Sequence, residues 1–172
     1  MLTGELVTLR PIEPADYPAL AVFTNDLEVA LLVGGLPPVP VPLASVSAIY
    51  ERRRENPDEV NFAITSNEGD GLLIGQCGLF RHDPIGRTCE LGIAIGDRDH
   101  WGRGYGRETV SMLSDYAFRV RNIRKVCLSV NATNERALRA YVAAGFVEEG
   151  RRLRHVWSDG EYIDMVLMAR FQ

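Results

Sequence analysis

The stretch LGIAIGDRDHWGRGYGRETV, residues 91–110, decides the fold. It opens on an apolar run that is typical of a buried strand, and glycines follow at positions 102, 104 and 106. From Gly106 onward small and apolar residues recur every three or four positions, which predicts an amphipathic helix. The first N–H groups of a helix have no partner within it, and glycine lets a ligand come close to the backbone. This junction therefore predicts a site for an anion such as a phosphate.

Two common phosphate-binding patterns do not fit this loop. A P-loop requires GxxxxGK[ST], but the loop has neither that spacing nor a lysine, and the only lysine of the chain is Lys125. A dinucleotide-binding fingerprint requires GxGxxG with an acidic residue about 20 positions later. Thr109 stands where its last glycine belongs, and the apolar run around Val126 occupies the later position. The pattern that remains is a shorter GxGxG between a strand and a helix.

The composition is that of a single soluble globular domain. The chain has 172 residues, of which 46% are hydrophobic and 24% charged, and no apolar run approaches the roughly 18 residues of a membrane span. The net charge of −4 offers no basic excess for nucleic acid, and the N-terminus does not resemble a signal peptide. We expect one domain over residues 1–172, located in the cytoplasm, with neither nucleic acid nor a membrane as partner.

The cysteines and histidines predict reduced thiols and no metal site. Each cysteine lies in an apolar run, and there is no CxxC pair. No histidine has metal-ligand spacing to another histidine or to a cysteine, and we assign none of them a catalytic role. These residues are Cys77, Cys89, Cys127, His82, His100 and His155.

Periodicity and turn residues divide the chain into about seven strands and four helices. The expected strands cover residues 5–12, 60–65, 72–80, 88–96 and 126–130, followed by two strands of a final hairpin. The expected helices run from Pro14 through Phe23, from Leu43 to Glu55, from the glycine loop to about Asn122, and from Asn134 to Ala144. Asp159-Gly160 predicts a type I′ turn in the hairpin, whereas the proline-rich residues 34–42 predict a shaped loop.

The connections predict a sheet that is mostly antiparallel. Hairpin-like turns link the strands around residues 60–96, but the strand–helix–strand unit around the glycine loop implies one parallel pair. On the helix after the loop, one buried stripe is expected at Gly106, Val110, Leu113, Ala117 and Val120. On the helix over residues 43–55, Ile49 and Tyr50 are expected to face inward, and the run ERRRE at 51–55 to be a solvated face.

Three segments together carry a resemblance to a known family. The element order, WGRGYG at 101–106, NATNERALRAYVAAGFVEEG at 131–150 and GEYIDMVLM at 160–168 resemble the GNAT acetyltransferases over nearly the whole chain. The chain looks most similar to the RimJ/RimL branch, which modifies protein N-termini, and to the related polyamine acetyltransferases. The acyl-CoA signature of the family is Q/R-x-x-G-x-G/A. Gly104 and Gly106 match it, but Trp101 replaces its first residue, which is tolerable because the loop acts through backbone amides.

The resemblance implies a mixed α/β, GNAT-type fold with acetyl-CoA as cosubstrate. Its mostly antiparallel sheet has one parallel pair, and these two strands splay apart at the acyl-CoA site. The glycine-loop amides then bind the pyrophosphate, and the backbone from Ile93 to Ile95 contacts the pantetheine arm and polarises the thioester carbonyl. The cofactor-binding residues implied are Ile93, Ala94, Ile95, Trp101, Gly102, Arg103, Gly104, Tyr105, Gly106, Arg107, Asn131, Asn134 and Ala137. Asn134 also suits a helix N-cap, which could be its only role.

Tyr141 is the candidate catalytic residue on the last helix. Family resemblance directs its hydroxyl at the sulfur of CoA, although its spacing from Leu138 and Ala137 also fits simple core packing. A phenol titrates near 10 and a thiol near 8.5, so full proton donation to the thiolate is uphill by about 2 kcal/mol. A hydrogen bond that stabilises the leaving thiolate requires less than full transfer.

Glu90 is the second candidate catalytic residue. It alternates with Leu91 on the expected strand, so the two side chains face opposite sides of the sheet. It is either a paired strand carboxylate or a general base that removes a proton, through water, from the incoming ammonium. An N-terminal amine with a pKa near 8 needs such a base less than a lysine-like amine near 10.4.

Together these features predict an N-acetyltransferase that moves an acetyl group from acetyl-CoA directly to a primary amine. The acceptor could be a protein N-terminus, a polyamine or another small amine, and a homodimer is a reasonable expectation. The acceptor pocket is expected between residues 34–42, the helix over 43–55 and the final hairpin. Asp164 is expected to order that hairpin. The alternatives are a CoA-binding sensor without turnover and an enzyme with another acyl donor or acceptor, including antibiotics and amino acids.

Overall fold

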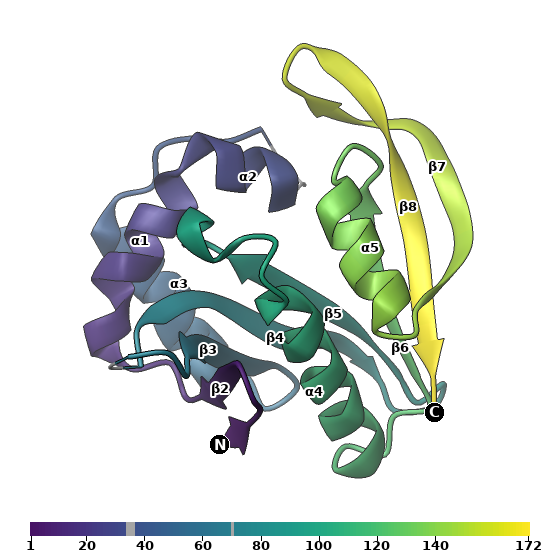
Figure 1. The fold of residues 1–172 in the computed structure, drawn as a ribbon, viewed down its shortest axis with the longest axis horizontal. Coiled ribbons are helices and arrows are strands. Elements are labelled where there is room, and N and C mark those ends of the chain that lie inside the picture. Colours follow the sequence, from purple (N-terminus) through teal and green to yellow (C-terminus); the bar gives the residue numbers. More distant parts are fainter. Residues whose placement is uncertain (34–36, 70) are drawn as a thin grey trace.

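The computed structural model describes residues 1–33, 37–69 and 71–172. In this part of the chain eight strands form one sheet in the order β1-β2-β3-β4-β5-β6-β8-β7 (Figure 1). The strands are β1 (Leu2–Thr3), β2 (Val7–Arg10), β3 (Val60–Ser66), β4 (Leu73–Asp83), β5 (Thr88–Ile95), β6 (Lys125–Asn131), β7 (Val147–Ser158) and β8 (Glu161–Phe171). The helices are α1 (Tyr17–Asn25), α2 (Leu27–Val33), α3 (Leu43–Glu55), α4 (Tyr105–Arg119) and α5 (Glu135–Ala143), with short 3-10 turns η1 (Pro14–Asp16) and η2 (Arg98–His100).

The expected mixed α/β architecture is confirmed, with two additional elements. β5 and β6 are the parallel pair, and the other neighbouring strands run antiparallel. The extra strand β1 has only two residues, too few to show a periodicity. The extra helix α2 has seven residues, and the Asp26 carboxylate caps it by accepting from the N–H groups of Glu28 and Val29. Asp26 directly before an apolar run is a helix-start signal that the prediction of four helices did not use.

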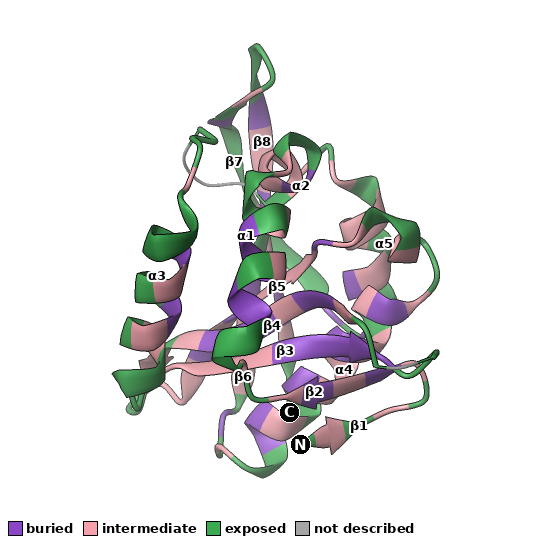
Figure 2. Ribbon diagram, turned by 90° about the vertical axis from the view of Figure 1, so that its left-hand side faces the viewer, coloured by how far each residue is buried: buried purple, intermediate pink, exposed green. Residues whose placement is uncertain are grey.

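Two hydrophobic clusters hold the helices on opposite faces of the sheet (Figures 1 and 2). On α4 the expected stripe is confirmed at Val110, Leu113 and Ala117, which are fully buried. The expectation for Val120 is wrong, because α4 ends at Arg119 and leaves Val120 65% exposed. On α3, Tyr50 is buried as expected and stacks on Tyr17, but Ile49 is 36% exposed because it lies one position away from the buried face.

The final hairpin forms as predicted, at the edge of the sheet. Asp159 and Gly160 both have positive φ angles, +47° and +87°, as a type I′ turn requires. The Asp164 carboxylate accepts from the N–H of Arg154 at 2.8 Å and so orders the two strands. The hairpin projects beyond the body of the molecule (Figure 1).

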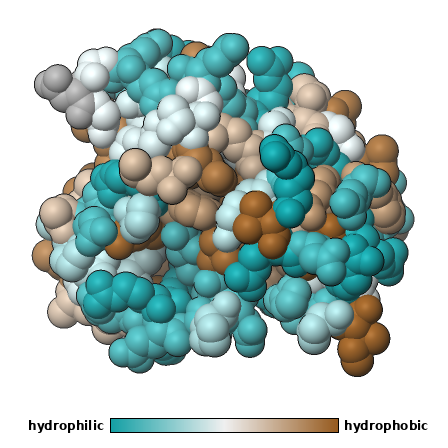
Figure 3. Space-filling model, turned by 90° about the horizontal axis from the view of Figure 1, so that it is seen from below, coloured by the Kyte–Doolittle hydropathy of each residue, from teal (hydrophilic) through white to brown (hydrophobic). Residues whose placement is uncertain are grey.

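The surface and the thiols agree with a compact globular chain. The face in Figure 3 is mostly hydrophilic, and its hydrophobic residues lie in separate patches. None of the described helices combines the length and the apolar character needed to cross a bilayer. Across residues 1–33, 37–69 and 71–172, no three His, Cys, Asp or Glu side chains group in a way that could hold a metal ion. Cys77 and Cys89 are buried, Cys127 is half-buried, and all three are free thiols.

Candidate active site

The candidate site is a cleft of about 990 Å³ that opens where β5 and β6 separate. The two strands pair only from Thr88 to Glu90 on β5 and from Lys125 to Cys127 on β6. Beyond these positions β5 continues to Ile95 and β6 to Asn131 without pairing with each other. The backbone groups that face the gap are therefore available to an extended ligand.

The glycine loop forms one wall of the cleft, next to the N-terminus of α4. Gly102 and Gly104 have φ angles of +74° and +93°, a left-handed conformation that favours glycine. Gly104 is the N-cap residue of α4, and the first hydrogen bond of the helix runs from the Glu108 N–H to the Gly104 carbonyl. The N–H groups of the first turn thus have no helical partner and lie at the positive end of a 15-residue helix. The loop and the start of α4 thus provide the free N–H groups that the predicted anion site requires.

Trp101 has a structural role that the sequence did not reveal. Its indole Nε1 donates to the carbonyl of Ile95 at 2.7 Å, which ties the loop to the end of β5. The Arg136 guanidinium lies 3.7 Å from the centroid of the Trp101 ring, and burial lowers the pKa of Arg136. Arg107 and Arg136 both line the cleft, and neither forms an ion pair with another described residue. Both are available to a phosphate.

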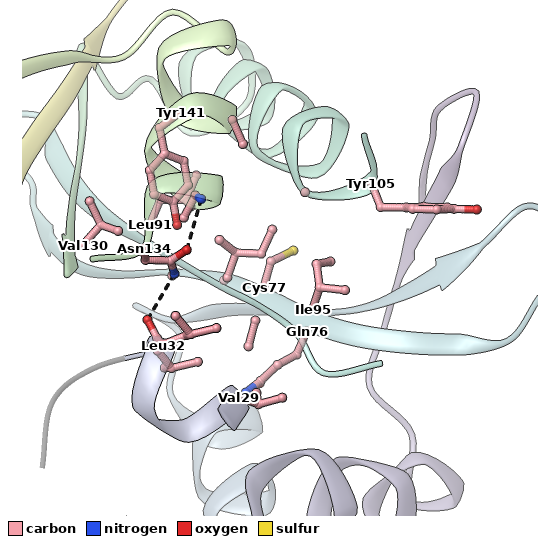
Figure 4. A pocket seen from close by; sticks show the side chains of 18 of the residues that line it. Val29, Leu32, Gln76, Cys77, Leu91, Ile95, Tyr105, Val130, Asn134 and Tyr141 are labelled. Atoms are coloured by element: carbon pink, nitrogen blue, oxygen red, sulfur yellow. Dashed lines mark hydrogen bonds between the residues drawn. The ribbon is translucent and has the colours of Figure 1, made fainter. Parts of the chain in front are cut away.

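Three other loop-related predictions have different outcomes. Gly106 and Tyr105 line the cleft as expected, although the Tyr105 side chain points away from its centre (Figure 4). Arg103 is not a lining residue, because its guanidinium pairs with Glu68 at 2.8 Å and lies over the Tyr105 ring. Any contact of Arg103 with a phosphate therefore rests on its main-chain N–H.

The two candidate asparagines also differ. Asn134 lines the cleft and caps α5, since its Oδ1 accepts from the Ala137 N–H at 3.1 Å, and its Nδ2 donates to the Leu32 carbonyl (Figure 4). Asn131 is 3% exposed and is not a lining residue. It instead donates to the Leu31 carbonyl at 3.0 Å, so the side-chain contact predicted between Asn131 and pantetheine is not supported. Both amides secure α2 over the end of β6.

Tyr141 points from α5 into the cleft, close to Asn134 (Figure 4). The residue is 8% exposed and its ring packs against Phe146 with the centroids 6.1 Å apart. Among the described residues, none forms a hydrogen bond with its hydroxyl. Burial raises the pKa of Tyr141 to about 12, so the phenol stays protonated at physiological pH.

Glu90 lies at the point where β5 and β6 part, and it is already paired. Both of its carboxylate oxygens accept from Nη1 of Arg81, at 2.8 and 3.0 Å.

The remaining predicted contacts of the cofactor also line the cleft, namely Ile93, Ala94, Ile95 and Ala137. His100 also lines it, with Nδ1 at 3.1 Å from Oδ2 of Asp97, whereas His82 and His155 do not.

The cleft extends to the face of the sheet covered by α2 and α3, and most of the residues that line it there were not predicted. Val29, Leu32 and Val33 of α2 line it, together with Arg52 and Arg53 of α3. Gln76 points toward α2 (Figure 4). The ERRRE run is thus not wholly a solvated face. The acceptor pocket was also expected to include residues 34–42 and the final hairpin. Residues 37–42 and the hairpin do not line the cleft, and residues 34–36 lie outside the described part of the chain.

The fold and this cleft define an acyl-CoA-dependent transferase. Residues 7–147 match the acetyltransferase (GNAT) domain family. The chain is 30% identical to spermidine N(1)-acetyltransferase of Vibrio cholerae over 124 residues, which cover 72% of this chain and 70% of that protein. It is 27% identical to the Escherichia coli K12 spermidine N(1)-acetyltransferase, over all of this chain and 89% of that protein. The crystal structure of the Vibrio cholerae spermidine N-acetyltransferase with CoA and spermine has a TM-score of 0.87, at 26% identity, covering 96% of this chain and 95% of that chain.

The chain belongs to the GNAT acetyltransferases. It is an acetyl-CoA-dependent N-acetyltransferase, and its acceptor is an amine.

Proposed function

We propose that the pyrophosphate of acetyl-CoA binds the main-chain N–H groups from Gly102 to Arg107 and that its pantetheine arm lies between β5 and β6. The separation of these strands after Glu90 and Cys127 carries this proposal. The amides of pantetheine can pair with an exposed strand edge in the manner of an added strand. The amides from Ile93 to Ile95 then face the thioester, where one of them stabilises the developing oxyanion.

The amine attacks the thioester directly. The one cysteine that lines the cleft is Cys77, and burial raises the pKa of its thiol far above the ordinary value. A thiol that stays protonated is a poor nucleophile, so an acyl-cysteine intermediate is disfavoured. Catalysis then rests on proximity, polarisation of the carbonyl and stabilisation of the leaving thiolate.

Tyr141 acts in this scheme as a hydrogen-bond donor to the thiolate of CoA. With the pKa of Tyr141 near 12, full proton transfer to a thiolate of pKa about 8.5 is uphill by about 5 kcal/mol. This free-energy cost is larger than the roughly 2 kcal/mol that the ordinary pKa of a phenol gives. The hydroxyl therefore stabilises the thiolate without ionising, and the proton that finally reaches the sulfur comes from solvent.

Glu90 assists acceptor deprotonation only when the acceptor needs it. We expect Glu90→Gln to lower kcat/KM at pH 7 about tenfold for a lysine-like amine of pKa near 10.4. For an N-terminal amine of pKa near 8 we expect less than about threefold. The effect falls short of that of a free general base because Arg81 engages both carboxylate oxygens. Without the base only the neutral amine reacts, so the rate of the variant should rise with pH up to the amine pKa.

Rate profiles from pH 6 to pH 10 with both kinds of amine measure this dependence. Equal losses for the two amines would contradict the base role and leave Glu90 as the ion-pair partner of Arg81. Glu135→Gln is a matched control, because Glu135 also pairs with an arginine, Arg139, but does not line the cleft.

We also propose a RimJ/RimL-like place within the family, a cytoplasmic location and a homodimer. The motif pattern supports the first, and the three reduced thiols support the second. The exposed apolar side chains of the β7–β8 hairpin, Leu153, Trp157 and Tyr162, support the third, because aromatic residues on a projecting element are common at interfaces. Size-exclusion chromatography with light scattering tests the dimer, and a monomer at all concentrations would refute it.

The decisive experiment for the function follows free CoA released from acetyl-CoA with a panel of amines. The panel contains N-terminal peptides, spermidine and free amino acids. Release with at least one of them, together with a mass gain of 42 Da on that amine (the mass of an acetyl group less one hydrogen), is the expected result. Thermal stabilisation by acetyl-CoA with no release on any amine would instead favour a CoA-binding sensor.

A further inference from the structure

The residues on one face of β3, β4 and β5 form cross-strand rows that lie along the cleft toward the proposed thioester site. Asn61, Gly78 and Gly92 are cross-strand partners, and so are Ala63, Gln76 and Ala94. Phe80 and Glu90 form the row at the outer end. Because Cys89 and Leu91 belong to the core under α4 and α5, Glu90 faces the side covered by α2 and α3.

Five charged side chains line this outer end of the cleft, and positive charge predominates. They are Arg52, Arg53, Glu59, Arg81 and Glu90. Arg81 pairs with Glu90 at 2.8 Å, whereas the contact of Arg53 with Glu59 is a longer 3.9 Å. Within the described residues Arg52 has no ion-pair partner. Two carboxylates thus face three guanidinium groups, and the other polar groups of this end, Asn56 and Asn61, carry no charge.

The position of these arginines on α3 is not explained by helix electrostatics alone. Basic residues in the last turn of a helix do complement its dipole, and Arg54 meets that need as well. Arg54 pairs with Glu51 at 2.5 Å and does not line the cleft. Arg52 and Arg53, in contrast, line the cleft.

We propose that the acceptor is a primary amine that carries an anionic group, and that Arg52 and Arg53 bind this group. The inference rests on the proposed function, because it assumes that the acceptor enters between α2, α3 and the sheet. A polyammonium compound would meet like charges at this end of the cleft. A carboxylate would form charge-assisted hydrogen bonds there, and the guanidinium groups would favour the neutral, nucleophilic form of the amine.

The anionic group and the amine occupy different parts of the cleft. Arg53 contacts Glu59, which directly precedes β3, whereas the amine lies beside Ile93 to Ile95, where the thioester is proposed to bind. Because the α-carboxylate of a free amino acid lies next to its own amine, we expect an acceptor in which several bonds separate the two groups. A short peptide with an acidic side chain and an amino acid with a long chain between its amine and its carboxylate both have this separation.

Matched acceptors test the charge preference. We expect kcat/KM for the amide-capped peptide Ala-Ala-Glu to be about tenfold higher than for Ala-Ala-Gln. We expect it to exceed kcat/KM for Ala-Ala-Lys and for spermidine by a larger factor. The same preference is expected for 8-aminooctanoate over octylamine, and the pair with the larger ratio identifies the source of the anion. The double variant Arg52→Gln/Arg53→Gln should remove the preference, whereas Arg54→Gln, the neighbouring arginine outside the cleft, should retain it.

A binding measurement separates failure of this inference from failure of the proposed function. Calorimetry with Ala-Ala-Glu and the CoA-loaded protein requires no turnover. Arginine-dependent binding of the acidic peptide, with no CoA release from acetyl-CoA on that peptide or on any amine of the panel, would support the anionic ligand and overturn the acetyltransferase function. Acceptor turnover with equal kcat/KM for the acidic and the neutral peptide would overturn the inference and leave the function standing. An equal loss of preference in Arg54→Gln and in the double variant would also overturn it.

Discussion

Replacing Tyr141 by phenylalanine should lower kcat about 30-fold and leave the affinity for acetyl-CoA unchanged. The ring would still pack against Phe146, so the substitution removes only the hydroxyl that points into the cleft. A hydrogen bond to a charged partner contributes about 1.5 to 3 kcal/mol, and a loss of about 2 kcal/mol corresponds to a rate change of about 30-fold. The effect should appear in kcat because the thiolate develops only during the reaction.

Tyr50→Phe is the matched control for this variant. Tyr50 is also buried, burial likewise raises its pKa to about 12, and it does not line the cleft. Steady-state kinetics give kcat, and calorimetry with acetyl-CoA gives the Kd. An unchanged kcat in Tyr141→Phe with intact binding would eliminate the thiolate role and leave Tyr141 as a core residue. A similar loss in Tyr50→Phe would assign the effect to packing.

Gly104→Ala should weaken acetyl-CoA binding about 30-fold. The residue has a φ of +93°, where a side chain costs about 1 to 2 kcal/mol, and its Cβ would lie 3.2 Å from Cδ1 of Leu6. Relief of this strain displaces the loop amides, each of which contributes about 1.5 to 3 kcal/mol when it binds a charged oxygen. Loss of one such contact is enough to produce the expected change in Kd.

Gly160→Ala separates backbone strain from loss of the anion site. Gly160 has a φ of +87° in the β7–β8 turn, far from the glycine loop in sequence, and nothing lies within 4 Å of a Cβ placed there. Thermal denaturation should show a lowered Tm for both variants, whereas calorimetry should show a weakened Kd only for Gly104→Ala. Unchanged acetyl-CoA affinity in Gly104→Ala would place the pyrophosphate away from the loop.

Local signals in the sequence were enough to predict the core of the fold. The bounds of α3 and the type I′ turn at Asp159 and Gly160 follow from caps, prolines and turn residues, which act over a few positions. The glycine loop was predictable for the same reason, because its function lies in its own backbone. The error at Val120 is also local, since the position where a helix ends depends on the chain that follows it.

Features that depend on contacts between distant segments could not be predicted. Asn131 has the residue type and position of a ligand contact, but its amide binds the Leu31 carbonyl, 100 residues away in the sequence. The pairing of Glu90 with Arg81 requires the β4–β5 register, and the exposure of Arg52 and Arg53 to the cleft requires the position of α3 over the sheet. Charge pattern within a helix does not say which elements the helix faces.

The parting of β5 and β6 also has a consequence for the lifetime of the protein. Backbone groups along the gap between β5 and β6 lack strand partners, so local unfolding of the sheet costs less free energy there than elsewhere. A thioester that binds in the gap between β5 and β6 stabilises the folded state by mass action, by about 2.7 kcal/mol when its concentration is 100 times its Kd. Resistance to proteolysis would then follow the acetyl-CoA supply, so that metabolic state sets both the rate of the enzyme and its abundance.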